Sequence, residues 1–184
     1  MCLRNEVKNQ RCERARIPLE YWDLSLESLQ TTSPDLQYSQ QIFVNLADRW
    51  KRNTRPTGQL VLLSGKPATS RVFGILLVKA ALYRFDALWC SLMELSASYF
   101  SDKELFFRAM RVPVLGLYIG PDGENQGVRY LLMQLLDARS EARRFCTIYV
   151  LGMSPPEIMK RYGTHDLWQK QGSFQTIPDE ELTL

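Results

Sequence analysis

The residues of this chain that best match a known chemistry lie at 65–72, between a continuous apolar run and a helical stretch. In α/β proteins a loop at this place binds phosphate, because backbone N–H groups and a helix N-terminus converge on it. Loops that hold a triphosphate with magnesium have the pattern G-x-x-x-x-G-K-[ST]. Here the eight positions are Gly65, Lys66, Pro67, Ala68, Thr69, Ser70, Arg71 and Val72. The segment predicts a nucleotide-binding-like loop that keeps the first glycine of the pattern.

The three other key positions of this loop are replaced, and each replacement changes its chemistry. Ser70 resists the positive φ that glycine adopts freely. Arg71 is a bulkier, forked cation than lysine, and Val72 has no oxygen to offer Mg²⁺. We therefore expect metal-assisted hydrolysis to fail here. Two interpretations of Lys66 and Arg71 stay open: they bind an anion through charge-assisted hydrogen bonds, or they are solvated loop cations.

The cysteines and the single histidine give no sign of a metal or catalytic centre. Cys2, Cys12, Cys90 and Cys146 form no Cys-x-x-Cys pair, and His165 is distant from all of them in sequence. This spacing does not favour a zinc site, and we predict no metal. Free thiols are typical of a cytoplasmic protein. We interpret His165 as a surface or cap residue and not as a catalytic group.

Hydrophobic periodicity predicts the elements that position the loop. Apolar residues from Ile42 to Trp50 follow helical spacing behind the start signal Ser33-Pro34-Asp35. The sequence then predicts buried strands at 59–64, 87–92, 112–119 and 147–151, and helices at 71–83, 101–110 and 125–143. Strands and helices that alternate in this way predict an α/β fold with a mostly parallel central sheet covered by helices.

Length and composition fit one domain with a short appendage. The 184 residues are 45% hydrophobic, which supplies a core, and the net charge is +3. We expect an N-terminal arm and lead-in at 1–34 and an α/β domain at 35–184; the first 20 residues are polar, without hydrophobic period, and are expected to form an arm with a mobile start. No signal peptide opens the chain and no apolar run approaches the ~18–20 residues that span a bilayer, so we expect a cytoplasmic protein.

The order of these segments resembles the bacterial helicase loaders of the DnaC type and the related IstB transposition ATPases, which are AAA+ proteins. The resemblance covers about residue 15 to the C-terminus and implies a three-layer P-loop NTPase fold. Its first segment, Ala15–Trp22, is similar to the family's alanine-x-isoleucine-proline-x-x-tyrosine lead-in. The other segments are the helix that ends near Trp50, the loop at 65–72, and the stretches 139–150 and 156–163.

The same resemblance implies ATPase residues that this sequence lacks. The family ends one hydrophobic strand in two carboxylates, where this chain has Tyr118 and Ile119. The sensor amide is replaced by Leu151-Gly152, and no arginine finger is present in 164–168. Together with the altered loop, these losses predict a pseudo-ATPase with no catalytic residue and no cofactor.

We predict a non-catalytic interaction protein that acts with a DNA replication, transposition or other mobile-element machine. Its partner would be a helicase, a transposase or an AAA+ homologue, and the chain would be a monomer or a subunit of a hetero-complex. Two alternatives stay open. One is a weak ATP-binding switch or ATPase, with Arg71 in place of lysine and Asp122 or Glu124 contacting magnesium. The other is a DNA-binding accessory subunit.

Candidate DNA or partner contacts are basic or aromatic. Basic grooves combined with aromatic side chains bind single strands, but arginines also cap helix ends, and both interpretations apply to the arginines here. Tyr21 and Trp22 follow the Pro18 turn and either anchor a partner or clamp the arm onto its own core. The candidate arginines are Arg108, Arg111, Arg129, Arg139, Arg143 and Arg144.

Overall fold

The computed structural model describes residues 3–31, 33–52, 54–63, 67–120, 126–141, 146–152, 156–157, 160, 172–178 and 182. The helices in this part of the chain are α1 (Leu3–Arg14), the 3₁₀ turn η1 (Leu19–Tyr21), α2 (Pro34–Arg52), α3 (Pro67–Ala81), α4 (Leu92–Phe100), α5 (Glu104–Arg111) and α6 (Gln126–Glu141). The strands are β1 (Gly58–Leu63), β2 (Ala87–Ser91), β3 (Val114–Ile119), β4 (Cys146–Leu151) and β5 (Gly172–Thr176).

The five strands form one sheet in the order β2-β3-β4-β1-β5. Every neighbouring pair is parallel, as the predicted sheet requires. In register, Leu151 at the end of β4 pairs with Leu63 of β1 on one side and with Ile119 of β3 on the other. The carboxyl ends of three strands therefore meet at one edge of the sheet, which is where open parallel sheets bind their ligands.

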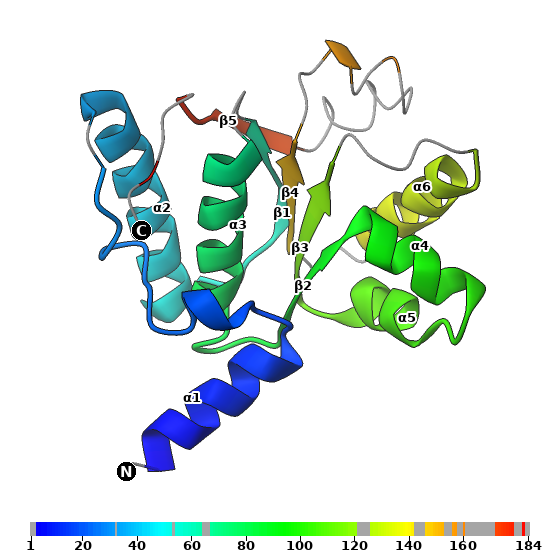
Figure 1. Cartoon of the computed structure of the whole chain (residues 1–184), viewed down its shortest axis with the longest axis horizontal. Coiled ribbons are helices and arrows are strands. Elements are labelled where there is room, and N and C mark those ends of the chain that lie inside the picture. Colours follow the sequence, from blue (N-terminus) through cyan, green and yellow to red (C-terminus); the bar gives the residue numbers. More distant parts are fainter. Residues whose placement is uncertain are drawn as a thin grey trace.

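Helices cover both faces of the sheet, which gives three layers (Figure 1). α2 and α3 lie on one face, where Phe43 and Phe73 stack with ring centroids 5.0 Å apart. α4, α5 and α6 lie on the other face, over a second buried cluster. The apolar residues that follow helical spacing in α6 are all buried, namely Val128, Leu131, Leu132, Leu135 and Leu136. The predicted three-layer α/β architecture is confirmed.

Side-chain caps fix where two of the helices begin. The hydroxyl of Ser33 accepts a hydrogen bond from the Leu36 N–H at 3.1 Å, so the predicted start signal of α2 is confirmed. At Ser91 a capping box ends β2 and begins α4: the Ser91 hydroxyl accepts from the Glu94 N–H, and the Glu94 carboxylate accepts from the Ser91 N–H. α4 was not predicted, and the predicted strand at 87–92 includes its first residue, Leu92.

The N-terminal arm contains a helix that hydrophobic periodicity did not indicate. Leu3–Arg14 is α-helical. Cys12 in its last turn and Ala15 just after it are buried, and Lys8 forms a 3.3 Å ion pair with Asp23. The Ala15 carbonyl accepts a hydrogen bond from the N–H of Trp89 in β2 at 2.8 Å. Cys12 and Ala15 alone are too few to give a hydrophobic period, so the sequence does not predict this helix.

None of the helices that the structure describes combines the length and apolar character needed to span a membrane.

Candidate functional site

The predicted phosphate loop enters α3 earlier than expected. α3 begins at Pro67 and not at Arg71, because proline is well suited to the first position of a helix. Within its first turns, Thr69, Ser70 and Val72 are buried, while Ala68 and Arg71 are exposed. Arg71 is therefore the cation that α3 presents at the strand ends. Gly65 and Lys66 lie outside the described residues.

Two glycines let α3 approach the sheet closely. A methyl group at Gly74 of α3 would lie 2.3 Å from Cγ2 of Val150 in β4. A methyl group at Gly116 of β3 would lie 2.4 Å from Cγ2 of Val78 and 2.6 Å from Cε3 of Trp89. Neither glycine has room for a side chain, so α3 is held directly against β3 and β4. This packing fixes the start of α3 beside the carboxyl ends of those strands.

Arg71 stacks on Tyr118 at this place. The guanidinium carbon of Arg71 lies 5.5 Å from the centroid of the Tyr118 ring, within cation–π range. The same ring covers the end of β4: a methyl group at Gly152 would lie 2.6 Å from the Tyr118 hydroxyl. The fold thus brings together Arg71 of the loop, Tyr118 and Gly152, with Tyr118 between the other two. The resemblance assigns these positions to the loop cation, the acidic pair and the sensor.

A cleft of about 320 Å³ opens beside this stack. Its walls include Arg71, Tyr118 and Trp89, and its carboxylate is Glu94 of α4. Glu94 is fixed by its capping box and by a 2.5 Å ion pair with Arg16. Burial acts to raise the pKa of Glu94, but hydrogen bonds from Ser91 and the charge of Arg16 outweigh it and hold that pKa below its ordinary value. The carboxylate is charged at neutral pH and already paired.

Glu94 and Arg16 are two residues of this region that the sequence alone did not predict. The S-x-x-E spacing of Ser91 and Glu94 was the available signal, since it is the pattern of a capping box. The pairing with Arg16 had no signal, because the two residues are 78 positions apart. Among the residues that the structure describes, no group of three or more His, Cys, Asp or Glu could hold a metal ion.

Arg139, a candidate DNA contact, lies in the interior and is only 3% exposed. Its Nη1 donates to the carbonyls of Ala109 and Val112 at 2.6 and 2.9 Å, which closes the C-terminal end of α5. Nε donates to the Thr147 hydroxyl and Nη2 to the Cys146 carbonyl, both at 2.7 Å. Burial lowers the pKa of this guanidinium to about 10. Arg139 joins α5, α6 and β4 and is unavailable to DNA.

The other predicted contacts are divided between surface and core. Arg111 of α5 and Arg129 of α6 are exposed and Arg108 is half-buried, whereas Arg143 and Arg144 lie outside the described residues. Tyr21 and Trp22 pack against the core on the α3 face. The Trp22 indole donates to the Ile17 carbonyl at 2.8 Å, which is the arrangement expected of a clamp on the lead-in.

Comparison with known proteins gives matches in structure alone: no family model and no curated protein matches the sequence. The structure of the DnaC helicase loader matches with a TM-score of 0.70 and 12% identity, over 87% of this chain and 99% of that one. The DnaI structure matches with a TM-score of 0.67 and 13% identity, over 87% and 90%. The chain has the AAA+-like P-loop fold of the DnaC helicase loader.

This DnaC-type fold confirms the fold class predicted from the sequence. AMPPCP-bound DnaA from Aquifex aeolicus is also similar, with a TM-score of 0.54 and 8% identity, over 88% of this chain and 51% of that chain. The chain thus spans about half the length of that DnaA structure. At these identities the similarity is one of fold, and the chemistry of the site has to be argued from its own residues.

Proposed function

We propose that this chain is a helicase-loader-like protein of a DNA replication machine that acts by binding a partner and does not hydrolyse ATP. The stack of Arg71 on Tyr118, with the Tyr118 ring packed over Gly152, carries the proposal. It fills the place where an ATPase of this fold needs a metal and a free cation. The replication role rests on the similarity to the DnaC helicase loader.

The side chains at this place are poor ligands for magnesium. Mg²⁺ binds through carboxylates, hydroxyls and water in near-octahedral geometry. A tyrosine offers one neutral hydroxyl on a bulky ring, where an aspartate would offer two anionic oxygens. Val72, at the position where the loop pattern has a metal-binding hydroxyl, is buried and 5% exposed. Nucleotide hydrolysis would therefore lack both metal and activated water.

The expected partner is a protein, namely a helicase, a transposase or an AAA+ homologue. We expect no cofactor, and a monomer or a hetero-complex in place of a ring that assembles around ATP. Cys12, Cys90 and Cys146 are buried free thiols, which is consistent with the cytoplasm. Capture experiments with the tagged chain in an extract of its source test the partner, and recovery of no helicase, transposase or AAA+ homologue would contradict the proposal.

A phosphate-release assay with ATP and Mg²⁺ tests the loss of catalysis. We expect no release above buffer, and no change when Arg71 is replaced by alanine. Metal-dependent release that is abolished by Arg71→Ala would overturn the pseudo-ATPase proposal. Calorimetric titration of ATP in the same samples separates binding from turnover.

A weak ATP-binding switch is the second candidate, because Arg71 is exposed near the N-terminus of α3. Helix N-termini bind anions without any catalytic residue, and an arginine adds a forked donor. Titration of ATP that shows saturable heat in the wild-type chain and none in Arg71→Ala would support the switch. The DNA-binding alternative loses Arg139, which is buried, and keeps the other candidate arginines, and a mobility shift on single-stranded DNA that weakens steeply with salt would support it.

A further inference from the structure

A second cavity lies at the opposite end of α3 from the candidate nucleotide site. Its volume is about 470 Å³, within the range of ~300–1,000 Å³ typical of small-molecule sites. The walls are one face of α1, the loop at 24–27, the end of α2 and the end of α3. Along α3, the lining residues Leu76 and Lys79 are five and eight positions after Arg71, which at ~1.5 Å per residue is about 8 and 12 Å along the helix.

The floor of this cavity is apolar. It is formed by Leu24 and Leu26 from the loop and by Leu76 and Leu82 from α3 and the turn after it. Leu26 and Leu76 are each 2% exposed and Leu82 is 6% exposed, so the floor is continuous with the α3-side core. An apolar ligand would be removed from water here without disturbing the fold.

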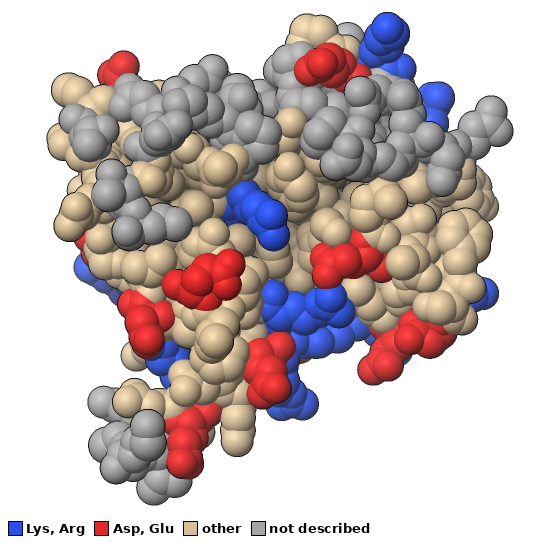
Figure 2. All heavy atoms as spheres, in the orientation of Figure 1, with Lys and Arg blue, Asp and Glu red and all other residues tan. Residues whose placement is uncertain are grey.

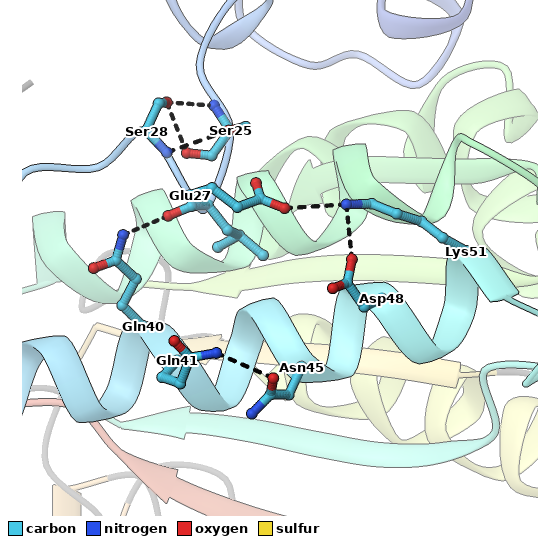
Figure 3. A network of polar contacts seen from close by, with 9 residues as sticks. Ser25, Glu27, Ser28, Gln40, Gln41, Asn45, Asp48 and Lys51 are labelled. Atoms are coloured by element: carbon cyan, nitrogen blue, oxygen red, sulfur yellow. Dashed lines mark hydrogen bonds and ion pairs between the residues drawn. The ribbon is translucent and has the colours of Figure 1, made fainter.

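Polar contacts hold the loop wall in place (Figure 3). The backbone N–H of each of Ser25 and Ser28 donates to the other's hydroxyl, at 2.8 and 3.2 Å. The Gln40 amide of α2 donates to the Leu26 carbonyl at 2.6 Å, and Lys51 bridges Glu27 and Asp48 at 3.1 Å each. The wall is therefore tied to α2 at Leu26 and Glu27, and the cavity is pre-formed.

Two cations at this cavity bind backbone carbonyls in place of carboxylates. Arg11 of α1 donates to the Leu82 carbonyl at 2.8 Å, and Lys79 of α3 donates to the carbonyls of Tyr21 and Leu24. Within the part of the chain that the structure describes, neither cation has a carboxylate at ion-pair distance. By contrast, Lys51 on the same rim is paired twice. Burial, with help from the charge of Lys8, lowers the pKa of Lys79.

We propose that this cavity binds an amphipathic carboxylate, with its apolar chain on the leucine floor and its carboxylate between Lys79 and Arg11. An anion would neutralise the two cations, whereas a neutral chain would leave them uncompensated and a cationic one would be repelled. The occupant is a free organic acid and not a protein segment, since the cavity is walled on four sides and has the volume of a single small ligand.

Titration of the full chain with decanoate, kept below its micelle concentration, tests the proposal. We expect saturable binding that shifts the ¹³C-methyl resonances of Leu24, Leu26, Leu76 and Leu82. Decanol and decyltrimethylammonium, which carry the same chain without the negative charge, should bind at least about tenfold more weakly. Equal binding of decanol, or methyl shifts confined to other leucines, would overturn the proposal, and shifts produced only by an acidic peptide would assign the cavity to a protein partner instead.

Variants at the cavity separate charge from packing. Arg11→Gln and Lys79→Met should each weaken decanoate binding roughly tenfold, because each removes a charged hydrogen-bond donor. Arg129→Met is the matched control, and binding should stay within about twofold, since this exposed arginine of α6 does not line the cavity and lies on the other face of the sheet. If Lys79→Met does not fold, Arg11→Gln and the cavity-filling Ala80→Phe test the proposal, and both should weaken decanoate binding. Unchanged binding in Arg11→Gln contradicts the proposal.

Discussion

Arg71 and Tyr118 are 47 positions apart in sequence, yet the guanidinium of Arg71 lies 5.5 Å from the centre of the Tyr118 ring. The contact joins the start of α3 to the end of β3. In the surface view the front of the molecule carries intermixed basic and acidic groups (Figure 2), so a single basic face is not what sets this arginine apart. Its partner is an aromatic ring, at a position where the resemblance to the helicase loaders implies a carboxylate.

The coupling between these two side chains is measurable. Tyr118→Leu and Arg71→Met should each lower the free energy of unfolding, and the double variant should lose less than the sum. We expect a coupling energy of about 0.5–1 kcal/mol, the size of an exposed cation–π contact. Chemical denaturation of the four proteins measures it, and strictly additive losses would show that the contact contributes nothing.

Replacing Gly74 by alanine should destabilise the protein. In a helix interior alanine is favoured over glycine by about 1 kcal/mol, so local propensity alone predicts a gain. A methyl group here would lie 2.3 Å from Val150, and overpacking of this kind costs about 1–3 kcal/mol. The sign of the change in unfolding free energy therefore decides between the two effects. A more stable Gly74→Ala variant would mean that α3 does not sit this close to β4.

Arg139→Met should be among the most damaging single substitutions. It would leave the carbonyls of Ala109, Val112 and Cys146 without a donor that now satisfies them. At about 1–3 kcal/mol for each buried polar group left unsatisfied, we expect a loss above ~3 kcal/mol. The exposed Arg129→Met serves as the control and should change the stability by less than about 0.5 kcal/mol. Thermal and chemical unfolding of the two variants gives the comparison.

The ion pair of Glu94 with Arg16 predicts a pH dependence of stability. The pKa of Glu94 is lower in the folded protein than in the unfolded chain, so its contribution is present above the unfolded pKa near 4.5 and is lost as the pH falls through the lower folded value. The stability difference between wild type and Glu94→Gln should be largest near neutral pH and should shrink on acidification. A stability difference that is constant between pH 7 and pH 3 would show that the charge of Glu94 does not stabilise the fold.

Periodicity and spacing were sufficient to predict four strands of the sheet and the helix α6. Buried strands and amphipathic helices have local patterns of apolar residues that can be read from the sequence. Periodicity and spacing were insufficient for Arg139, whose partners come from α5 and β4 and are up to 30 positions away. β5 was also missed, since Gly172–Thr176 is short and lacks an apolar run. At the site, the sequence placed Tyr118 in a predicted strand, and the structure has it in β3, but the contact of its ring with Arg71 could only be seen in the fold.

β2 is an edge strand of the sheet, and the hydrogen bonds along its outer side affect whether copies of the chain can associate. The N–H groups of Ala87, Trp89 and Ser91 donate respectively to the Asp86 carboxylate, the Ala15 carbonyl and the Glu94 carboxylate, all outside the sheet. An exposed strand edge normally offers such donors to a second chain and so promotes polymerisation. Here the donors are already bonded to the protein's own lead-in and helix cap, so a second chain cannot add a strand on this side. A truncation that removes Ala15 would leave the Trp89 N–H unpaired and the edge prone to aggregation.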